Sequence, residues 1–214
     1  MENNNYLFID FLKKRLKEPL PGLESQKMMA PTTPKDFFRS FKPTKTAQQS
    51  AVMVLLVEDS GINNLLLTLR SMNISHSGQI SFPGGRCENG ETVESAALRE
   101  TLEETGIDIN KIKIIGKLSD LFVPPSDNII TPVVGYTSEK LSIKANRDEV
   151  DEVFFVPFAN LIGDEYKRDE EWDFNGIKVK VPIWDIHNTT PLWGATAMIL
   201  AELIYISKEF FDQK

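Results

Sequence analysis

Apolar residues recur at helical spacing near both ends of the chain. The first pattern covers residues 6–17 and stops before Pro19, which predicts an N-terminal helix. Near the other end we predict a second helix, with Thr190 as its cap and Pro191 in its first turn. Its apolar stripe consists of Ile199, Leu203 and Ile206. Helices are therefore expected at both ends of the fold.

Runs of apolar and β-branched residues between these helices predict strands. The first two runs, residues 51–58 and 65–70, are separated by Asp59-Ser60-Gly61, a break typical of a hairpin. Later strands are expected at three places, residues 113–118, 129–136 and 153–157. A short helix is expected to follow them at residues 158–163.

Asn175-Gly176 is a strong signal for a tight turn, and it predicts a hairpin between residues 172–174 and 177–181. Strands with helices before, between and after them indicate an α/β fold, in which helices sandwich a mixed sheet. A length of 214 residues suits one substantial domain.

Residues 21–49 are rich in proline and threonine and predict an irregular arm rather than regular structure. We therefore divide the chain into an N-terminal helix and extended arm, residues 1–49, and a main domain, residues 50–214. The arm is expected to lie over the surface of this chain or of another copy. A homodimer is thus one open alternative.

The composition narrows the classes of function. With 41% hydrophobic and 26% charged residues the chain reads as a soluble globular protein, and it has no apolar run near the roughly 20 residues of a membrane span. Its start lacks the features of a secretory signal, and the single cysteine, Cys87, cannot form an internal disulfide, so we expect a cytoplasmic protein. The net charge of −7 argues against nonspecific binding to nucleic acid. An acidic protein that acts on phosphates would need cations.

Residues 93–105 are the most informative part of the chain, because they predict a helix dense in carboxylates. Thr92 is a suitable N-cap for this helix, and Gly106 is a suitable stop. Leu98 and Leu102 lie roughly opposite the carboxylates and are expected to pack inward.

Three glutamates, Glu100, Glu103 and Glu104, share one face of this predicted helix. Like charges three and four residues apart repel one another on a helix. A hard divalent cation would relieve the repulsion, because Mg²⁺ takes oxygen ligands and leaves positions for water and substrate phosphates. A solvated charged face is the alternative that the helix alone leaves open.

The wider pattern around the helix resembles the signature of the Nudix hydrolases, which cleave a nucleoside diphosphate linked to another moiety. The matching positions are Gly85, Glu91, Arg99, Glu100, Glu103, Glu104, Gly106 and Ile107, and Thr101 stands where the family usually has an aliphatic residue. The resemblance implies an α/β/α sandwich with a mixed sheet and a loop-helix-loop motif. It also implies that Glu100, Glu103, Glu104 and the carbonyl of Gly84 bind Mg²⁺ or Mn²⁺.

Two further residues take roles in this resemblance. Arg99 is expected to orient a carboxylate, with Glu91 as its ion-pair partner, although a purely structural pair is the alternative. The family often adds an acidic residue from a later loop. In the acidic run of residues 148–152, Glu149 is our first choice for an extra ligand or general base, and an ordinary acidic loop is the alternative.

A second resemblance concerns the substrate. Residues 66–71, Gly78 and residues 82–85 look like the extra motif of the coenzyme A diphosphatases within the Nudix family, which split coenzyme A into 4′-phosphopantetheine and adenosine 3′,5′-bisphosphate. Residues 72–77 lack the arginine that this motif carries, and Ser75 stands near its expected place. The candidates for substrate contacts are Arg70, His76 and Gln79, and Arg86 or His76 is a candidate to replace the missing charge.

We therefore expect metal-dependent hydrolysis of a pyrophosphate bond in coenzyme A or its derivatives. One alternative keeps the chemistry and changes the substrate to ADP-ribose, a dinucleotide or an oxidised nucleotide. A second alternative is a Nudix-fold binding module without catalysis. The presence of all three glutamates favours an enzyme.

Overall fold

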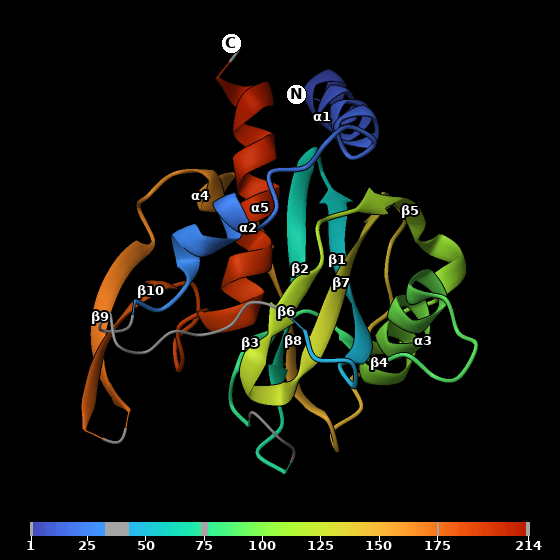
Figure 1. The fold of residues 1–214 in the computed structure, drawn as a ribbon. Helices are drawn as coiled ribbons and strands as arrows, with labels where there is room; N and C mark the ends of the chain where they lie inside the picture. The colour runs from blue at the N-terminus through green and yellow to red at the C-terminus, as the bar shows by residue number, and fades with distance from the viewer. Residues whose placement is uncertain (1, 33–42, 74–76, 175, 213–214) are drawn as a thin grey trace.

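A mixed β-sheet runs through the centre of the computed structural model, which describes residues 2–32, 43–73, 77–174 and 176–212, and helices lie on both of its faces (Figure 1). The strands of the sheet are β1 (Gln48–Asp59), β2 (Ile62–Arg70), β3 (Ile80–Ser81), β4 (Gly84–Arg86), β5 (Lys113–Lys117), β6 (Leu121–Val123), β7 (Asn128–Thr137) and β8 (Val150–Pro157). All the strands expected between residues 51 and 157 are present. The short strands β3, β4 and β6 are additional.

The helices are α1 (Glu2–Arg15), α2 (Leu23–Gln26), α3 (Val93–Thr105), α4 (Phe158–Ile162) and α5 (Gly194–Phe211). Short 3₁₀ turns lie at η1 (Lys27–Met29), η2 (Ile109–Lys111) and η3 (Pro124–Ser126). The expected hairpin is formed by β9 (Lys167–Phe174) and β10 (Ile177–Trp184), which make a separate two-stranded sheet. No helix of the described residues is both long and apolar enough to span a membrane.

The sheet splits between β1 and β2. These antiparallel strands pair near their turn, from Leu56 with Leu65 to Asp59 with Ile62. Further from the turn, β1 pairs with β4 and β2 pairs with β3, so that residues 80–86 form a wedge between the two strands. On its other side β1 pairs with β7 in parallel, and β8 lies on the other side of β2. The wedge therefore carries Gly84 and Gly85 into the middle of the sheet.

Successive side chains of β1 point to opposite faces of the sheet, so the strand contributes to two hydrophobic cores, one on each face. Val54 and Leu56 belong to the larger core, which packs against α1, α4 and α5. Met53 and Leu55 point to the opposite face and belong to a second core beneath α3, which Ala97 of that helix joins. Figure 1 shows α5 and α3 on opposite sides of the sheet. The predicted α/β/α sandwich is confirmed.

Helix α3 has the ends that its sequence predicts. The Thr92 hydroxyl accepts a hydrogen bond from the Ser95 N–H group at 3.2 Å, which caps the first turn. Gly106 ends the helix in the left-handed conformation (φ +69°), and its N–H group donates to the carbonyl of Leu102 at 2.8 Å. The N-cap threonine and the terminal glycine therefore correctly predict where α3 begins and ends.

The prediction that Leu102 packs inward is wrong, because its side chain is 45% exposed. The inward face of α3 instead carries Ala97, Thr101 and Glu104, which are buried, while Leu98 is partly buried against the second core. With 3.6 residues per turn, Leu102 lies about 100° round the helix from Thr101. The buried Thr101 hydroxyl donates to the carbonyl of Ala97 at 2.6 Å, which satisfies it in a position where the family has an aliphatic residue.

The terminal helix starts later than predicted. Trp193 is its N-cap residue and Gly194 its first residue, so the placement of Thr190 as cap and Pro191 in the first turn is wrong. Leu192 exchanges two backbone hydrogen bonds with Trp184, each of 2.9 Å. This bridge keeps the chain extended through residue 192 and delays the helix.

The first 30 residues pack closely on α5. Phe8 and Leu12 of α1 belong to the larger core. Glu202 of α5 is fully buried and accepts hydrogen bonds from the N–H group of Gly22 (2.8 Å) and the side-chain amide of Gln26 (3.1 Å). The prediction that residues 21–49 are irregular is wrong in part, because α2 and η1 are short helices. Residues 33–42 lie outside the described residues. The division of the chain at residues 49 and 50 stays a prediction.

Candidate active site

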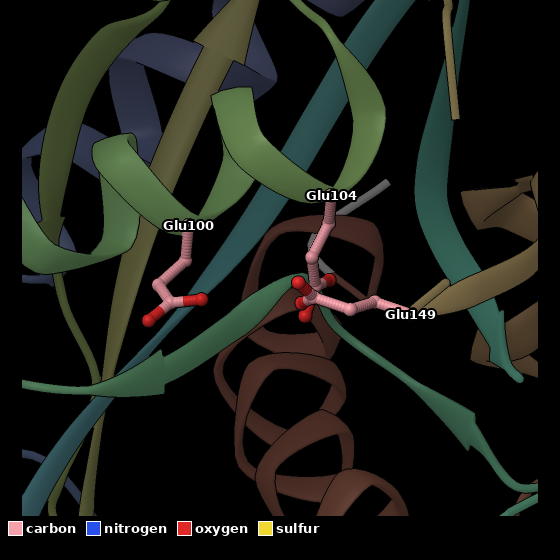
Figure 2. Close-up of side chains that lie close together, drawn as sticks. All are labelled: Glu100, Glu104 and Glu149. Carbon is pink, nitrogen blue, oxygen red and sulfur yellow. The ribbon is translucent and has the colours of Figure 1, made fainter. Parts of the chain in front are cut away.

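Three carboxylates meet beneath the wedge of the sheet. Glu100 and Glu104 project from α3, and Glu149 enters from the loop before β8 (Figure 2). Each offers an oxygen atom, and these three atoms lie within 4.8 Å of one another. The structure therefore brings Glu149 to two of the three helix glutamates, although they are separated by more than 40 residues in the sequence.

Glu104 is the most deeply buried member of this group, with 3% of its surface exposed. Its Oε2 atom is buried and has no hydrogen-bond partner among the described residues. Burial raises the pKa of Glu104 to about 8, and nearby Arg70 and a hydrogen bond with the backbone of Gly84 oppose this effect. The buried oxygen without a partner is therefore available to a cation.

Glu100 and Glu103 have different surroundings. Glu100 is largely buried, and burial raises its pKa, while a hydrogen bond from Arg99 opposes the effect. The side chain of Glu103 is 53% exposed and forms an ion pair with Arg99 at 3.1 Å. Glu103 lies outside the group formed by the other three carboxylates. Its role as a metal ligand stays a prediction.

Arg99 links the start of the motif to the helix carboxylates. Its guanidinium holds Glu91 with two hydrogen bonds of 3.0 Å, so the expected ion pair is present. It also donates to Glu100 at 2.9 Å and to the backbone carbonyl of Arg86 at 3.0 Å. The hydrogen bonds from Arg99 lower the pKa of Glu91, which keeps the pair charged. Arg99 thus fixes the direction in which Glu100 points.

The two glycines of the wedge allow a close approach. A Cβ atom added to Gly85 would lie 2.3 Å from Oε1 of Glu100, and one added to Gly84 would lie 2.4 Å from the carbonyl oxygen of Ala51. At Gly84 the added atom would meet backbone, so only glycine fits, whereas at Gly85 it would push the carboxylate of Glu100 out of its place. The role of the Gly84 carbonyl as a metal ligand stays a prediction.

The expected substrate contacts lie at the neighbouring end of β2. Arg70 is the last residue of this strand, and its positive charge acts to lower the pKa of Glu104. Its backbone N–H group donates to the carbonyl of Gln79 at 3.0 Å, which places Gln79 beside it. Arg86 is exposed at the end of β4. His76 and Ser75 lie outside the described residues.

One contact at the site was not foreseen in the sequence. The side-chain amide of Asn146 donates to Oε1 of Glu149 at 3.2 Å. An asparagine just before an acidic run is a turn signal, which could have pointed to this residue. Its contact with Glu149 depends on the fold of the loop.

The donor set fits a divalent metal ion. Carboxylate oxygens are the ligands that Mg²⁺ and similar hard cations prefer. A cation would offset the repulsion among the three clustered charges, and it would satisfy the buried oxygen of Glu104. The geometry therefore supports a divalent metal centre.

Comparisons with known proteins agree with this geometry. The model of the NUDIX domain matches residues 47–177. A solved Nudix hydrolase from M. smegmatis, RenU, has a TM-score of 0.51 and 17% sequence identity, and the alignment covers 76% of this chain and 88% of that one. At this identity the likeness concerns the fold alone.

Curated relatives are closer in sequence. Nudix hydrolase 3 of Caenorhabditis elegans is 34% identical over 170 residues, covering 72% of this chain and 71% of the relative. The human mitochondrial coenzyme A diphosphatase NUDT8 is 33% identical over 155 residues, covering 70% of this chain and 65% of the relative. The domain match and these identities show that the chain is a pyrophosphohydrolase that belongs to the Nudix hydrolase family.

Proposed function

We propose that this enzyme hydrolyses the pyrophosphate bond of coenzyme A or one of its derivatives, giving 4′-phosphopantetheine and adenosine 3′,5′-bisphosphate. The observation that carries the proposal is the position of the segment that resembles the coenzyme A motif, residues 66–85. Two residues of this segment lie at the carboxylates. Arg70 is close enough to lower the pKa of Glu104, and the backbone of Gly84 forms a hydrogen bond with the same side chain. The identity with a relative named as a coenzyme A diphosphatase supports the same substrate.

The proposed metal ligands are Glu100, Glu104 and Glu149, with Glu103 and the carbonyl of Gly84 as further candidates. Bound Mg²⁺ or Mn²⁺ would polarise phosphoryl oxygens and lower the pKa of a bound water. Arg99 would hold Glu100 in place through its hydrogen bond of 2.9 Å. Glu149 would serve as an extra ligand or as the base that accepts a proton from the attacking water.

Positive charge beside the carboxylates would orient the substrate. Arg70 lies at the end of β2 next to Glu104, and a guanidinium can hold a phosphate with two hydrogen bonds. Gln79, adjacent to Arg70, is a second proposed contact, and His76 a third. Arg86, which is exposed at the end of β4, is our candidate to supply the positive charge that residues 72–77 lack.

The experiment that tests the substrate is a screen of pyrophosphate compounds with Mg²⁺ and with Mn²⁺, with products identified by mass. Adenosine 3′,5′-bisphosphate from coenzyme A is the expected product. Release of AMP from ADP-ribose at a higher kcat/KM would favour the alternative substrate class and overturn the proposal. The Glu104→Gln variant is the matched control, and it should release neither product above background.

Two further parts of the proposal concern the state of the protein in the cell. We propose a homodimer, in which the segment before β1 would contact a second copy, and a cytoplasmic location. Sedimentation of the purified protein tests the first, and fractionation of its source cells tests the second. The human relative is named as mitochondrial, so an organellar fraction is the competing result.

A further inference from the structure

The loop that carries Glu149 folds around one asparagine, Asn146. The backbone carbonyl of Asn146 accepts hydrogen bonds from the N–H groups of Glu149 (3.0 Å) and Val150 (2.8 Å). Its side-chain Oδ1 accepts a hydrogen bond from the N–H group of Asp148 at 3.2 Å. Together these bonds form a tight turn of the kind that asparagine favours. The turn leads directly into β8.

Asn146 also contacts two of the three clustered acidic residues. Its backbone N–H group donates to the carbonyl of Glu104 at 2.9 Å, at the end of α3. Its side-chain Nδ2 donates to Oε1 of Glu149 at 3.2 Å. The loop can lie this close to the helix because Gly106 has no side chain, since an added Cβ would come within 2.8 Å of the carbonyl oxygen of Lys144. One residue therefore joins the end of α3 to the carboxylate of Glu149.

The main chain of Glu149 is held from both sides. Its N–H group donates to Asn146, and its carbonyl accepts a hydrogen bond from the N–H group of Ser71 at 2.9 Å. A fixed main chain still leaves the glutamate side chain free to rotate about several bonds. The amide of Asn146 restricts that rotation, because it holds Oε1 of Glu149 at a defined point.

We propose that Asn146 is a positioning residue, whose side-chain amide holds the Glu149 carboxylate toward Glu104 and Glu100. This inference rests on the proposed role of Glu149. An ionised carboxylate has two oxygens and can accept one N–H group while offering its other lone pairs to a cation or a water proton. A neutral amide suits this task, because a lysine or arginine at the same place would compete with the cation for the negative charge.

Two substitutions separate positioning from turn formation. Asn146→Ser keeps a short oxygen that can accept the Asp148 N–H group, but it cannot reach Glu149. Asn146→Ala loses both contacts. If Asn146 positions Glu149, the serine variant should lose as much kcat as the alanine variant, about tenfold or more, with KM within about twofold of the parent. Recovery of the parent kcat by serine would show a role in the turn alone and would overturn the proposal.

A binding measurement without substrate gives a second readout. If Glu149 is a metal ligand, titration of each variant with Mn²⁺, followed by the electron paramagnetic resonance of the free ion, should show about tenfold weaker binding for both substitutions. Urea unfolding checks that the serine variant retains the parent fold. A folded serine variant that keeps both the parent Mn²⁺ affinity and the parent kcat would contradict the proposal.

Combination with Glu149→Gln distinguishes failure of this inference from failure of the function on which it rests. When Glu149 is already impaired, adding Asn146→Ala should cause no further loss of kcat, because the two residues act as one unit. Independent, multiplying losses would refute the role of Asn146 alone. Full activity of Glu149→Gln by itself would refute the role of Glu149, and the role of Asn146 with it.

Discussion

The substitution Glu104→Gln should stabilise the metal-free protein at pH 8 while removing its activity. Burial raises the pKa of Glu104 from 4.5 to about 8. The folded protein therefore keeps a proton on this carboxyl between these pH values, whereas the unfolded chain has lost it. The contribution of this carboxyl to the free energy of unfolding is fully present below pH 4.5 and is lost as the pH rises to about 8.

The size of the effect follows from the same values. Each tenfold step in a proton equilibrium is worth about 1.4 kcal/mol, so the ionisable side chain costs the metal-free fold about 4 kcal/mol at pH 8. A glutamine of the same shape carries no charge at any pH, but it buries an amide whose second polar atom also lacks a partner. We therefore expect a net gain of about 2 kcal/mol for Glu104→Gln at pH 8.

Urea unfolding in the presence of EDTA, followed by fluorescence of the three tryptophans, measures this gain. The parent protein should lose stability between pH 5 and pH 8, and Glu104→Gln should lose markedly less, because Glu100, whose pKa burial also raises, remains. Glu103→Gln is the matched control, because Glu103 lies on the same helix but is half exposed, and it should follow the parent. Addition of Mg²⁺ at pH 8 should stabilise the parent more than Glu104→Gln. Parallel pH profiles of the parent and Glu104→Gln would refute the argument from burial.

Three other substitutions test separate parts of the structure. Gly85→Ala should reduce kcat about 100-fold, since its Cβ would displace the carboxylate of Glu100, whereas Gly163→Ala, with no atom within 4 Å of the added carbon, should leave kcat unchanged in the same assay. Arg99→Lys keeps the charge but loses the fork that holds Glu91, and steady-state kinetics should show a loss of about tenfold or more in kcat. Glu202→Ala removes the buried acceptor of the Gly22 N–H group and the Gln26 side-chain amide, and it should lower the free energy of unfolding in urea by about 3 kcal/mol.

Local signals in the sequence were enough to predict α3 and the strands with long apolar runs. A capping threonine and a terminal glycine act on the helix they flank, so the bounds of α3 needed no knowledge of the rest of the fold. The same approach failed at Thr190 and Pro191. There a backbone bridge between Leu192 and Trp184 keeps the chain extended, and the residues around Thr190 give no sign of this pairing with another segment.

The site was only partly predictable for a similar reason. Helical spacing places Glu100, Glu103 and Glu104 near one another, but it does not tell which face the sheet covers. The structure buries Glu104 and leaves Glu103 half exposed. The wedge of β3 and β4 gives no hydrophobic pattern, because its paired segments have only two and three residues. Its effect on Glu100 appears only once Gly85 is placed beside β1.

The split in the sheet has a consequence for how this enzyme can diverge. The segment between β2 and β3 is closed at its base, because Arg70 and Gly78 are joined by a backbone hydrogen bond of 3.0 Å and Arg70 and Gln79 by another of the same length. We therefore expect that a change in the number of residues between these hydrogen bonds would leave β4 paired with β1. Beyond that base, Gly85 of β4 lies opposite Ala51 of β1. If this loop contacts the substrate as we propose, changes in its length or charge would alter which nucleotide derivative is bound while the carboxylates of α3 stay in place.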